Sequence, residues 1–312
     1  MEKRKKRGYL EISFGWLFAI IVGATIIFLA IYFSTRLINI ERTTTGTETT
    51  KEIGILTNPL ETGFESAKTS SFTLPLEIKI YNQCDNYSGI FGEQKISLSE
   101  KSFNQWKKTG MEISFENKYF FSDDEVEGKT FHVFSKQFNF PFKIADLIFL
   151  TSSLNTYCFV NSPEEVQQEI SNLNQENLKV IGDEECPQGG ITICFDTGEC
   201  DINVASNYVR KENKRLYFEG NIALMYAAIF SSPEIYECQV SRLMKRTSEI
   251  ASLYDDKKDT LSDRGCTFDF EANIASFSNL ARGITSSSSL NEIKTKADNL
   301  DNLNKMGECL LW

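Results

Sequence analysis

Residues 15–34 read GWLFAIIVGATIIFLAIYFS, and this stretch sets the organisation of the whole chain. No charged residue occurs from residue 12 to residue 35. At about 1.5 Å of rise per residue, a helix of this length spans roughly 30 Å, the thickness of the hydrocarbon core of a bilayer. Trp16 and Tyr32, of the aromatic types enriched at membrane interfaces, occur near its two ends. We therefore predict a transmembrane helix over residues 9–38.

The residues that precede this helix are strongly basic. Five Lys and Arg side chains and one Glu give residues 1–8 a formal charge of +4. The basic flank of a membrane helix stays in the cytoplasm, so we predict a cytoplasmic segment at residues 1–8 and an extracytoplasmic chain beyond the helix. A removed secretory signal and the buried helix of a soluble protein are the competing interpretations. Secretory signals usually have an apolar part of about 7–15 residues that ends at a small-residue site, and neither feature is clear here.

The run KRKKRG, followed by YLEISFGWLFAIIVGATIIFL, resembles the class III signal of type IV pilin-like proteins, particularly archaeal ones. In that family a peptidase cuts after the glycine that ends the basic segment, and the apolar helix becomes the packing core of a filament. The resemblance implies cleavage between Gly8 and Tyr9 and an association with filament subunits or other envelope proteins. The family often carries Glu at the fifth mature position, whereas here Glu11 is third and Ser13 is fifth. The remainder of the chain matches no pilin head.

The chain beyond the helix has the composition of a folded domain. Hydrophobic residues make up 41% of the 312 residues, and 6 Pro and 18 Gly are too few for a disordered or collagen-like chain. The formal net charge of −10 argues against a nucleic-acid partner, because phosphate binding requires clustered Lys and Arg. We predict an α+β domain at residues 73–312, joined to the membrane helix by a Thr-rich juxtamembrane linker at residues 39–72.

Within this domain, residues 73–205 are predicted to be rich in strands and residues 206–312 rich in helices. Ile, Phe, Tyr and Val favour the pleated, half-buried surface of a sheet. Runs rich in these residues occur at 74–81, 95–99, 111–116, 118–122 and 129–134. Residues 145–152 fit either a strand or a helix.

Proline after a capping residue marks the predicted helix starts. Asn58-Pro59 and Ser162-Pro163, each followed by Glu, predict two short helices, of which the second runs through Leu173. Ser232-Pro233 starts a longer helix, and a capping box of Ser289 and Glu292 starts another. Their apolar stripes are Tyr236, Val240, Leu243, Thr247, Ile250 and Tyr254 in the first, and Leu290, Ile293, Ala297, Leu300 and Leu303 in the second. Such stripes suit a coiled coil or the domain's own core, and their short length favours the core.

The chain contains eight cysteines, all beyond the apolar stretch. They are Cys84, Cys158, Cys186, Cys194, Cys200, Cys238, Cys266 and Cys309. An even number confined to an exported domain favours disulfides, which persist in oxidising compartments. Structural zinc sites favour close pairs such as C-x2-C, often with histidine, whereas the closest pairs here are C-x7-C and C-x5-C and the chain has one histidine. Free buried thiols are the remaining alternative, and eight cysteines allow 105 pairings.

The segments ITICF and CDINV, residues 191–195 and 200–204, are predicted to form a β-hairpin across a four-residue loop. This register pairs Ile193 with Ile202 and places the apolar residues on one face. It also turns Cys194 to the other face, so that Cys194 and Cys200 cannot bond to each other. Each would then need another partner, for which Cys158 and Cys186 are candidates.

Few motifs in the sequence carry chemistry, and we predict no catalytic, cofactor-binding or metal-binding residue. Asp196-Thr197-Gly198 is the tripeptide of aspartic proteases, but those enzymes need two such aspartates that share a proton, and a hairpin loop favours the same residues. His132 occurs at strand spacing, where a half-buried histidine is ordinary. The sequence gives little support for a Ser or Cys catalytic triad, because it has one histidine and no G-x-S-x-G motif.

Two polar segments remain as candidate sites. The acidic run Asp123, Asp124, Glu125 and Glu127 offers hard oxygen ligands for Ca²⁺ without the spacing of an EF-hand, and a solvated loop is the plainer interpretation. Asn86-Tyr87-Ser88 is the one N-x-[ST] sequon, so Asn86 is a candidate glycosylation site.

These observations favour a single-pass membrane protein with its N-terminus in the cytoplasm and the lipid bilayer as its first partner. We predict a non-enzymatic surface component of the cell envelope that is pilin-like or binds another envelope molecule, and we expect no cofactor. One alternative is an anchored exoenzyme that works through two carboxylates, as glycosidases do. Another is an anchored solute-binding or sensory domain, which differs from the first by a small-ligand pocket.

Overall fold

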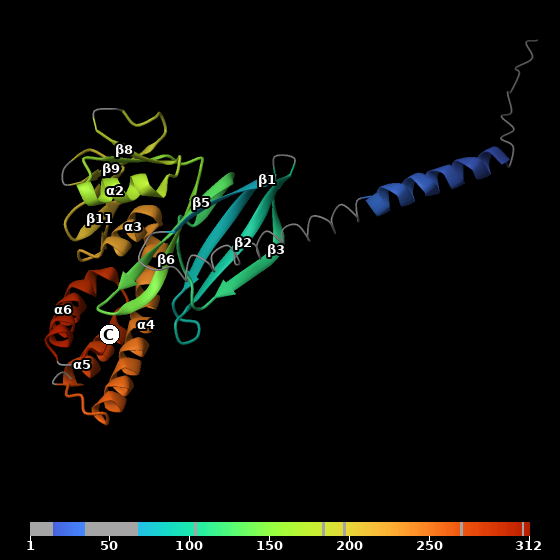
Figure 1. The fold of residues 1–312 in the computed structure, drawn as a ribbon. Coiled ribbons are helices and arrows are strands. Elements are labelled where there is room, and N and C mark those ends of the chain that lie inside the picture. The colour runs from blue at the N-terminus through green and yellow to red at the C-terminus, as the bar shows by residue number, and fades with distance from the viewer. Residues whose placement is uncertain are drawn as a thin grey trace, which may run out of the picture.

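The computed structural model describes residues 15–34, 68–102, 105–182, 185–195, 198–268, 271–307 and 309–312. Gly8, Tyr9, Asn58 and the proposed linker up to residue 67 lie outside these ranges. Gly15–Ser34 is one continuous helix, and none of its side chains is buried against the rest of the protein (Figure 1). It is long and apolar enough to cross a membrane, although a signal sequence near an N-terminus passes the same test of length and composition.

The first six strands form one sheet, sheet A, in the order β3-β2-β1-β5-β6-β4. Neighbouring strands are antiparallel except for β4 and β6, which are parallel. The strands are β1 (Lys68–Asp85), β2 (Glu93–Ser102), β3 (Gln105–Phe115), β4 (Tyr119–Phe121), β5 (Glu125–Asn139) and β6 (Lys143–Ser152). All five predicted strand runs are confirmed, and residues 145–152 belong to a strand. β1 begins at Lys68, within the range predicted as linker.

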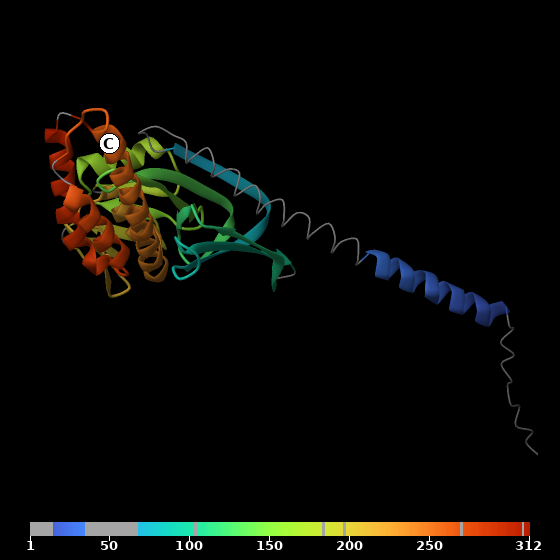
Figure 2. The same cartoon turned by 90° about the horizontal axis from the view of Figure 1, so that it is seen from below.

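Side chains of sheet A alternate between two cores, as expected for strands that are covered on both faces. Phe120, Phe131 and Ile148 lie in a small core enclosed by the curved sheet, whereas their neighbours Phe121 and Phe149 lie in the main core. The backbone N–H of Phe120 donates to Oε1 of Gln94 on β2 at 2.8 Å, and its carbonyl accepts from Nε2 of Gln94 at 2.9 Å. The side chain of Gln94 thus satisfies the backbone groups at the free edge of β4. The curvature of the strands is seen in Figure 2.

The second sheet, sheet B, is mixed and has the order β12-β11-β10-β9-β7-β8. Its strands are β7 (Tyr157–Val160), β8 (Leu178–Ile181), β9 (Ile191–Phe195), β10 (Ile202–Val204), β11 (Tyr208–Lys211) and β12 (Lys214–Tyr217). Four neighbouring strands of this sheet, β10, β9, β7 and β8, run parallel to one another. Helix α2 (Glu164–Leu173) connects β7 to β8. Strands therefore continue to Tyr217, beyond the predicted limit of the strand-rich region at residue 205.

The predicted hairpin is wrong, because β9 and β10 run parallel. Ile193 is paired with Ile202 as predicted, but Phe195 is paired with Val204, whereas the predicted hairpin would place Phe195 opposite Cys200. Both arrangements place the apolar residues on one face, since alternation specifies which face a side chain occupies and leaves the strand direction open. The prediction that Cys194 and Cys200 cannot bond is also wrong, because they form a disulfide across the loop that joins the two strands.

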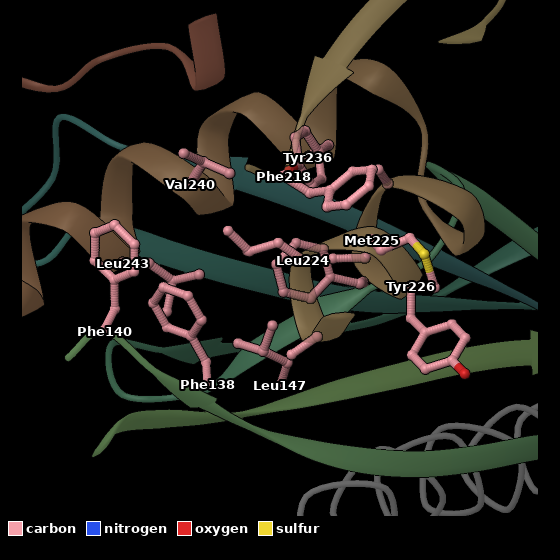
Figure 3. Packing of buried hydrophobic residues seen from close by; sticks show 14 of the residues in the cluster. Phe138, Phe140, Leu147, Phe218, Leu224, Met225, Tyr226, Tyr236, Val240 and Leu243 are labelled. Atoms are coloured by element: carbon pink, nitrogen blue, oxygen red, sulfur yellow. The ribbon is translucent and has the colours of Figure 1, made fainter. Parts of the chain in front are cut away.

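The last part of the chain is helical. It contains α3 (Ile222–Phe230), α4 (Pro233–Ser262), α5 (Glu271–Gly283), the 3-10 turn η1 (Ser287–Ser289) and α6 (Leu290–Met306). α3 is apolar on all sides and is packed between the two sheets, while α4, α5 and α6 form a bundle beside them (Figure 1). Figure 3 shows side chains of α3 and α4, such as Leu224 and Leu243, packed toward Phe138 and Leu147 of sheet A.

The predicted helix starts at Ser162-Pro163, Ser232-Pro233 and Ser289 are confirmed, whereas the start at Asn58-Pro59 lies outside the described residues. Of the three described starts, only one has the predicted side-chain cap. Ser232 accepts a hydrogen bond from the backbone N–H of Ile235 and caps α4. Ser162 and Ser289 make no such bond: the N-cap position of α2 is Pro163, and Ser289 belongs to η1. Both predicted stripes face the domain's own core, as expected.

All eight cysteines are paired. The disulfides are Cys84–Cys238, Cys158–Cys186, Cys194–Cys200 and Cys266–Cys309. The first joins sheet A to α4, and the last ties the loop after α4 to the C-terminal segment. That segment is part of the core, because Leu311 is fully buried and the ring of Trp312 packs on Phe142 and Tyr254. The fold is therefore α+β with four disulfides.

Candidate functional site

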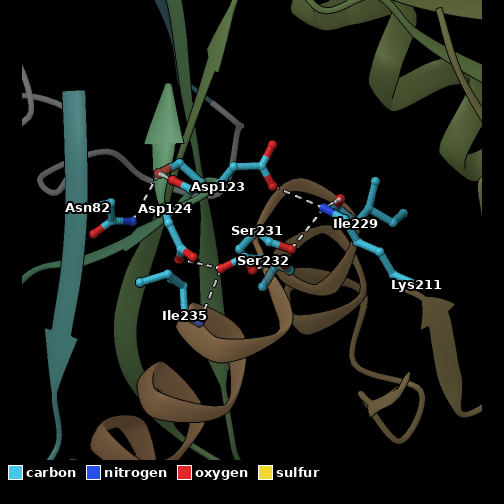
Figure 4. Close-up of polar contacts among 10 residues, drawn as sticks. Asn82, Asp123, Asp124, Lys211, Ile229, Ser231, Ser232 and Ile235 are labelled. Atoms are coloured by element: carbon cyan, nitrogen blue, oxygen red, sulfur yellow. Dashed lines mark hydrogen bonds and ion pairs between the residues drawn. The ribbon is translucent and has the colours of Figure 1, made fainter. Parts of the chain in front are cut away.

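The acidic loop between β4 and β5 is a structural junction (Figure 4). Oδ1 of Asp123 lies 3.1 Å from Nζ of Lys211, which also donates to the carbonyls of Ile229 and Ser231. Lys211 thus caps the C-terminal end of α3, where cations are favoured by the helix dipole. Asp124 accepts a hydrogen bond of 2.6 Å from Ser232, the N-cap of α4. These contacts fix the turn between α3 and α4 against sheet A.

The remaining carboxylates of the acidic run, Glu125 and Glu127 at the start of β5, also have partners. Glu125 and Glu127 form ion pairs with Lys79, and Glu127 forms another with Lys101. Within the described ranges, no group of three or more His, Cys, Asp or Glu residues is arranged to hold a metal ion. The Ca²⁺ interpretation of this run therefore gains no support from the described residues, because each of its carboxylates is already paired with a Lys or Ser side chain.

The loop that carries the protease-like tripeptide is shaped by a disulfide. Asp196 and Thr197 lie outside the described residues. A Cβ atom added at Gly198 would lie 2.7 Å from Sγ of Cys194, too close for any side chain. Glycine at this position is thus explained by the close approach of the Cys194–Cys200 bridge.

The candidate glycosylation site is already engaged. Nδ2 of Asn86 donates to Oγ of Ser241 at 3.2 Å, and the carbonyl of Asn86 accepts from Nζ of Lys245. A glycan on Nδ2 would disturb this contact with α4, which argues for an unmodified Asn86.

Arg242 on α4 is the largest fully buried side chain of the protein's described part. Burial lowers the pKa of its guanidinium, and the cation lies 4.8 Å from the ring centre of Tyr119. Its hydrogen-bond acceptors are Oε1 of Gln239 at 2.7 Å and the carbonyls of Phe91 at 3.1 Å, Phe115 at 3.2 Å, Glu116 at 2.9 Å and Lys118 at 3.2 Å. The fork of donors therefore binds two loops of sheet A to α4, which is a structural role.

The chain's one histidine lies beside a groove. His132 is buried on β5, and its Nε2 is 2.8 Å from Oγ of Ser153. Burial lowers the pKa of His132, and the nearby carboxylate of Glu176 opposes part of this shift. The imidazole is thus kept neutral near pH 7, where it offers one donor and one acceptor. The prediction of an ordinary buried strand histidine is confirmed, but the same residue forms the floor of a cavity.

We call this cavity the His132 groove. It has a volume of about 540 Å³ and lies between the β1–β5 pair of sheet A and the turn from α2 to β8 of sheet B. It is lined by Thr69, Ser70, Ser71, Thr73, Thr130, His132, Asn172, Leu173, Asn174, Gln175 and Glu176. Its volume is within the range of about 300–1,000 Å³ that is typical of small-molecule sites.

The two walls of the groove are tied together by Gln175. Its Nε2 donates to Oγ1 of Thr69 at 2.8 Å and to the carbonyl of Val133 at 3.3 Å, while its buried Oε1 has no hydrogen-bond partner among the described residues. Across the floor, the hydroxyls of Thr73 and Thr130 are 2.9 Å apart. The groove is thus supported by hydrogen bonds between two sheets.

The sequence analysis missed the groove because its parts are distant in the chain. Residues 68–72, which read KTSSF, are rich in hydroxyls and fall within the predicted linker, and residues 172–176 span the end of a predicted helix and carry no motif. Alternate hydroxyls in a strand are a signal for a polar face, but nothing in the sequence places that face opposite the α2–β8 turn.

One carboxylate of the described part has a raised pKa. Burial raises the pKa of Glu219 above its usual value, the direction that a general acid requires. Glu219 does not line the His132 groove. The hypothesis of an exoenzyme with two carboxylates therefore gains no specific support.

The chain was compared with protein-family models, curated proteins and solved structures, and no significant match was found in any of the three.

Proposed function

We propose that the protein is a single-pass membrane protein of the cell surface, with a cytoplasmic N-terminus and a non-enzymatic external domain that serves as an envelope component. The observation that carries this proposal is the combination of one exposed apolar helix with a domain in which every cysteine is paired. Disulfides persist outside the cytoplasm, and the basic residues before the helix favour the same orientation.

Protease protection in intact cells tests the topology. A tag appended after Trp312 would disturb a buried segment, so the tag belongs in the β1–β2 loop, where Tyr87 and Ile90 are highly exposed. We expect external protease to remove this tag and to spare a tag at Met1. Recovery of the full chain in the aqueous fraction of broken cells would overturn the proposal.

A hydrolase assay tests the non-enzymatic role. Hydrolysis of peptide or glycoside substrates that is abolished in an Asp196→Asn variant would assign an enzyme instead.

If the protein is also pilin-like, its N-terminal segment is cleaved after Gly8 and its apolar helix packs into a filament. It is supported by the basic run that ends at Gly8 and by the apolar helix that follows it. We expect mass spectrometry of the native protein to find Tyr9 as the first residue. An intact segment of residues 1–8 would remove the filament role and leave the membrane anchor in place.

A second candidate function, an anchored solute-binding domain, is favoured by the His132 groove. A small-ligand pocket is the feature that separates this function from a purely structural one. The groove combines unengaged polar side chains with walls that are held by hydrogen bonds, which suits the binding of a small polar molecule.

A further inference from the structure

The charges of the His132 groove exclude one large class of ligands. Among the described residues that line it there is no Lys or Arg, and Glu176 is the one carboxylate. His132 is buried and neutral near pH 7. A phosphate, sulfate or carboxylate group would therefore meet the carboxylate of Glu176 without a cation among these lining residues to pair with, and charged partners give anions their strongest hydrogen bonds.

The hydrogen-bonding groups of the groove are both donors and acceptors. Hydroxyls and carboxamides have this double capacity, and they make up most of the lining. Ser71, Asn172, Asn174 and Glu176 make no side-chain hydrogen bond to any residue that the structure describes. These four groups stand on both walls, Ser71 on β1 and the others at the end of α2 and its turn, and are ready to bind a ligand between them.

The apolar part of the lining is small. In the part of the lining that the structure describes, Leu173 is the one aliphatic side chain and no Phe, Tyr or Trp occurs. A flat heterocycle would find no ring to stack on, and a lipid chain would find little apolar surface. The ligand that fits is neutral and carries many hydroxyl groups.

We propose that the His132 groove binds a neutral saccharide, with its hydroxyls bonded to Ser71 on one wall and to Asn172, Asn174 and Glu176 on the other. A sugar hydroxyl donates and accepts at one oxygen, as do the hydroxyls and amides that face it. The Gln175 contacts with Thr69 and Val133 hold the walls at a fixed separation, which reduces the entropic cost of binding. This inference rests on the solute-binding function proposed above and names its ligand class.

Saccharide titration of the full chain tests the proposal. The chain is placed in lipid nanodiscs, because sugar-based detergents would compete for the groove. Maltotriose and mannotriose serve as neutral probes, 3′-sialyllactose as the anionic probe and the glucosamine trimer as the cationic probe, with binding followed by saturation-transfer NMR and calorimetry. We expect at least one neutral probe to bind with a Kd of about 0.1–1 mM and the anionic probe to bind at least tenfold more weakly.

Matched variants locate the binding site. Asn172→Ala on α2 removes an exposed amide from the groove, and Asn291→Ala removes an exposed amide from α6, outside the groove. We expect about fivefold to tenfold weaker binding for the first, the usual effect of one hydrogen bond, and no change for the second. Ser71→Trp, which fills the groove, should abolish binding without changing the circular dichroism spectrum or the melting temperature by more than a few degrees.

The outcomes separate this inference from the proposed function. Failure of both neutral probes to bind at 10 mM, equal binding to Ser71→Trp, or preference for the anionic probe would overturn the saccharide assignment, even with the external topology intact. A domain that protease cannot reach from outside the cell would overturn the proposed function, whatever the groove binds.

Discussion

The two sheets differ in how they are joined and held. In sheet A, most neighbouring strands are antiparallel and are joined by short connections, and its attachment to α4 uses the Cys84–Cys238 bridge and the buried Arg242. In sheet B, four strands are parallel, and its disulfides are short-range. Both sheets pack on α3, so the difference lies in the covalent ties: sheet A is joined to α4 by a bridge that is distant in the sequence, whereas the bridges of sheet B are local. Mutations that remove these ties should therefore lower the free energy of unfolding by different amounts in the two sheets.

Removal of the Cys84–Cys238 bridge should have the largest effect. The two residues are 154 apart in the sequence, and closure of so long a loop corresponds to about 5 kcal/mol in the chain-entropy model. Urea unfolding of a Cys84→Ala/Cys238→Ala variant, followed by circular dichroism, measures the loss in the free energy of unfolding. The Cys158→Ala/Cys186→Ala variant, with a separation of 28, is the control and should lose about 3.6 kcal/mol. Equal losses would contradict the importance of the long-range tie.

Substitution of Arg242 should come next. Arg242→Met leaves several buried carbonyls without a donor, at a cost of about 3–5 kcal/mol in the free energy of unfolding. Arg242→Lys keeps the positive charge but loses the planar fork and should be nearly as unstable.

Arg246→Met, one turn further along α4, is the matched control. Its Nε donates to the carbonyl of Ile144, so this change should cost only about 1 kcal/mol. An Arg242→Lys protein with an unchanged free energy of unfolding would show that the positive charge, and not the planar guanidinium, stabilises the contact.

The Cys194–Cys200 bridge of sheet B should contribute less. Its separation of 6 residues corresponds to about 2 kcal/mol. Gly198→Ala should destabilise the natural protein, because the added Cβ collides with Sγ of Cys194. The same change should be better tolerated in the Cys194→Ala/Cys200→Ala background, as a double-mutant cycle of unfolding energies would reveal. Additive effects would mean that the bridge does not restrict residue 198.

The smallest effect concerns pH and His132, which lies where the two sheets meet. Its pKa is lowered in the folded protein, so below pH 6.5 the unfolded chain binds more protons and stability falls as the pH decreases. Above the pKa of the unfolded state this penalty is absent. We expect the melting temperature to fall between pH 7 and pH 5, and His132→Gln should reduce the slope. Since the chain has one histidine, an unchanged slope would assign the pH dependence to other groups.

The contrast between the sheets also explains which sequence predictions succeeded. The strands of sheet A were readable because their apolar residues alternate and their partners are mostly neighbours in sequence. The pairing of β9 with β10 was misread because parallel and antiparallel registers bury the same side chains. The two arrangements differ only in the path of the loop, which must return to the opposite end of β9 before a parallel β10 can begin. No local sequence pattern indicates that path.

The candidate site was the least predictable part. His132 was placed correctly on a strand, but its partner Ser153 and the opposite wall of the groove come from other elements. The predicted helix N-caps show that sequence spacing can also fail to predict contacts between near neighbours. Ser162 and Ser289 have the right spacing for a cap, yet their hydroxyls make no bond to the first turn. Pro163 takes the cap position of α2, and Ser289 occupies that of α6 without the extended backbone of a capping residue.

The amino-acid sequence by itself determined the apolar helix, most strands, the starts of α2, α4 and α6 and the presence of disulfides, because each depends on residue types within a few positions of one another. Tertiary structure decided the cysteine partners, the strand directions of sheet B, the burial of Arg242 and the His132 groove. These features join residues far apart in the chain, and their geometry is fixed only when both sheets pack on α3 and α4.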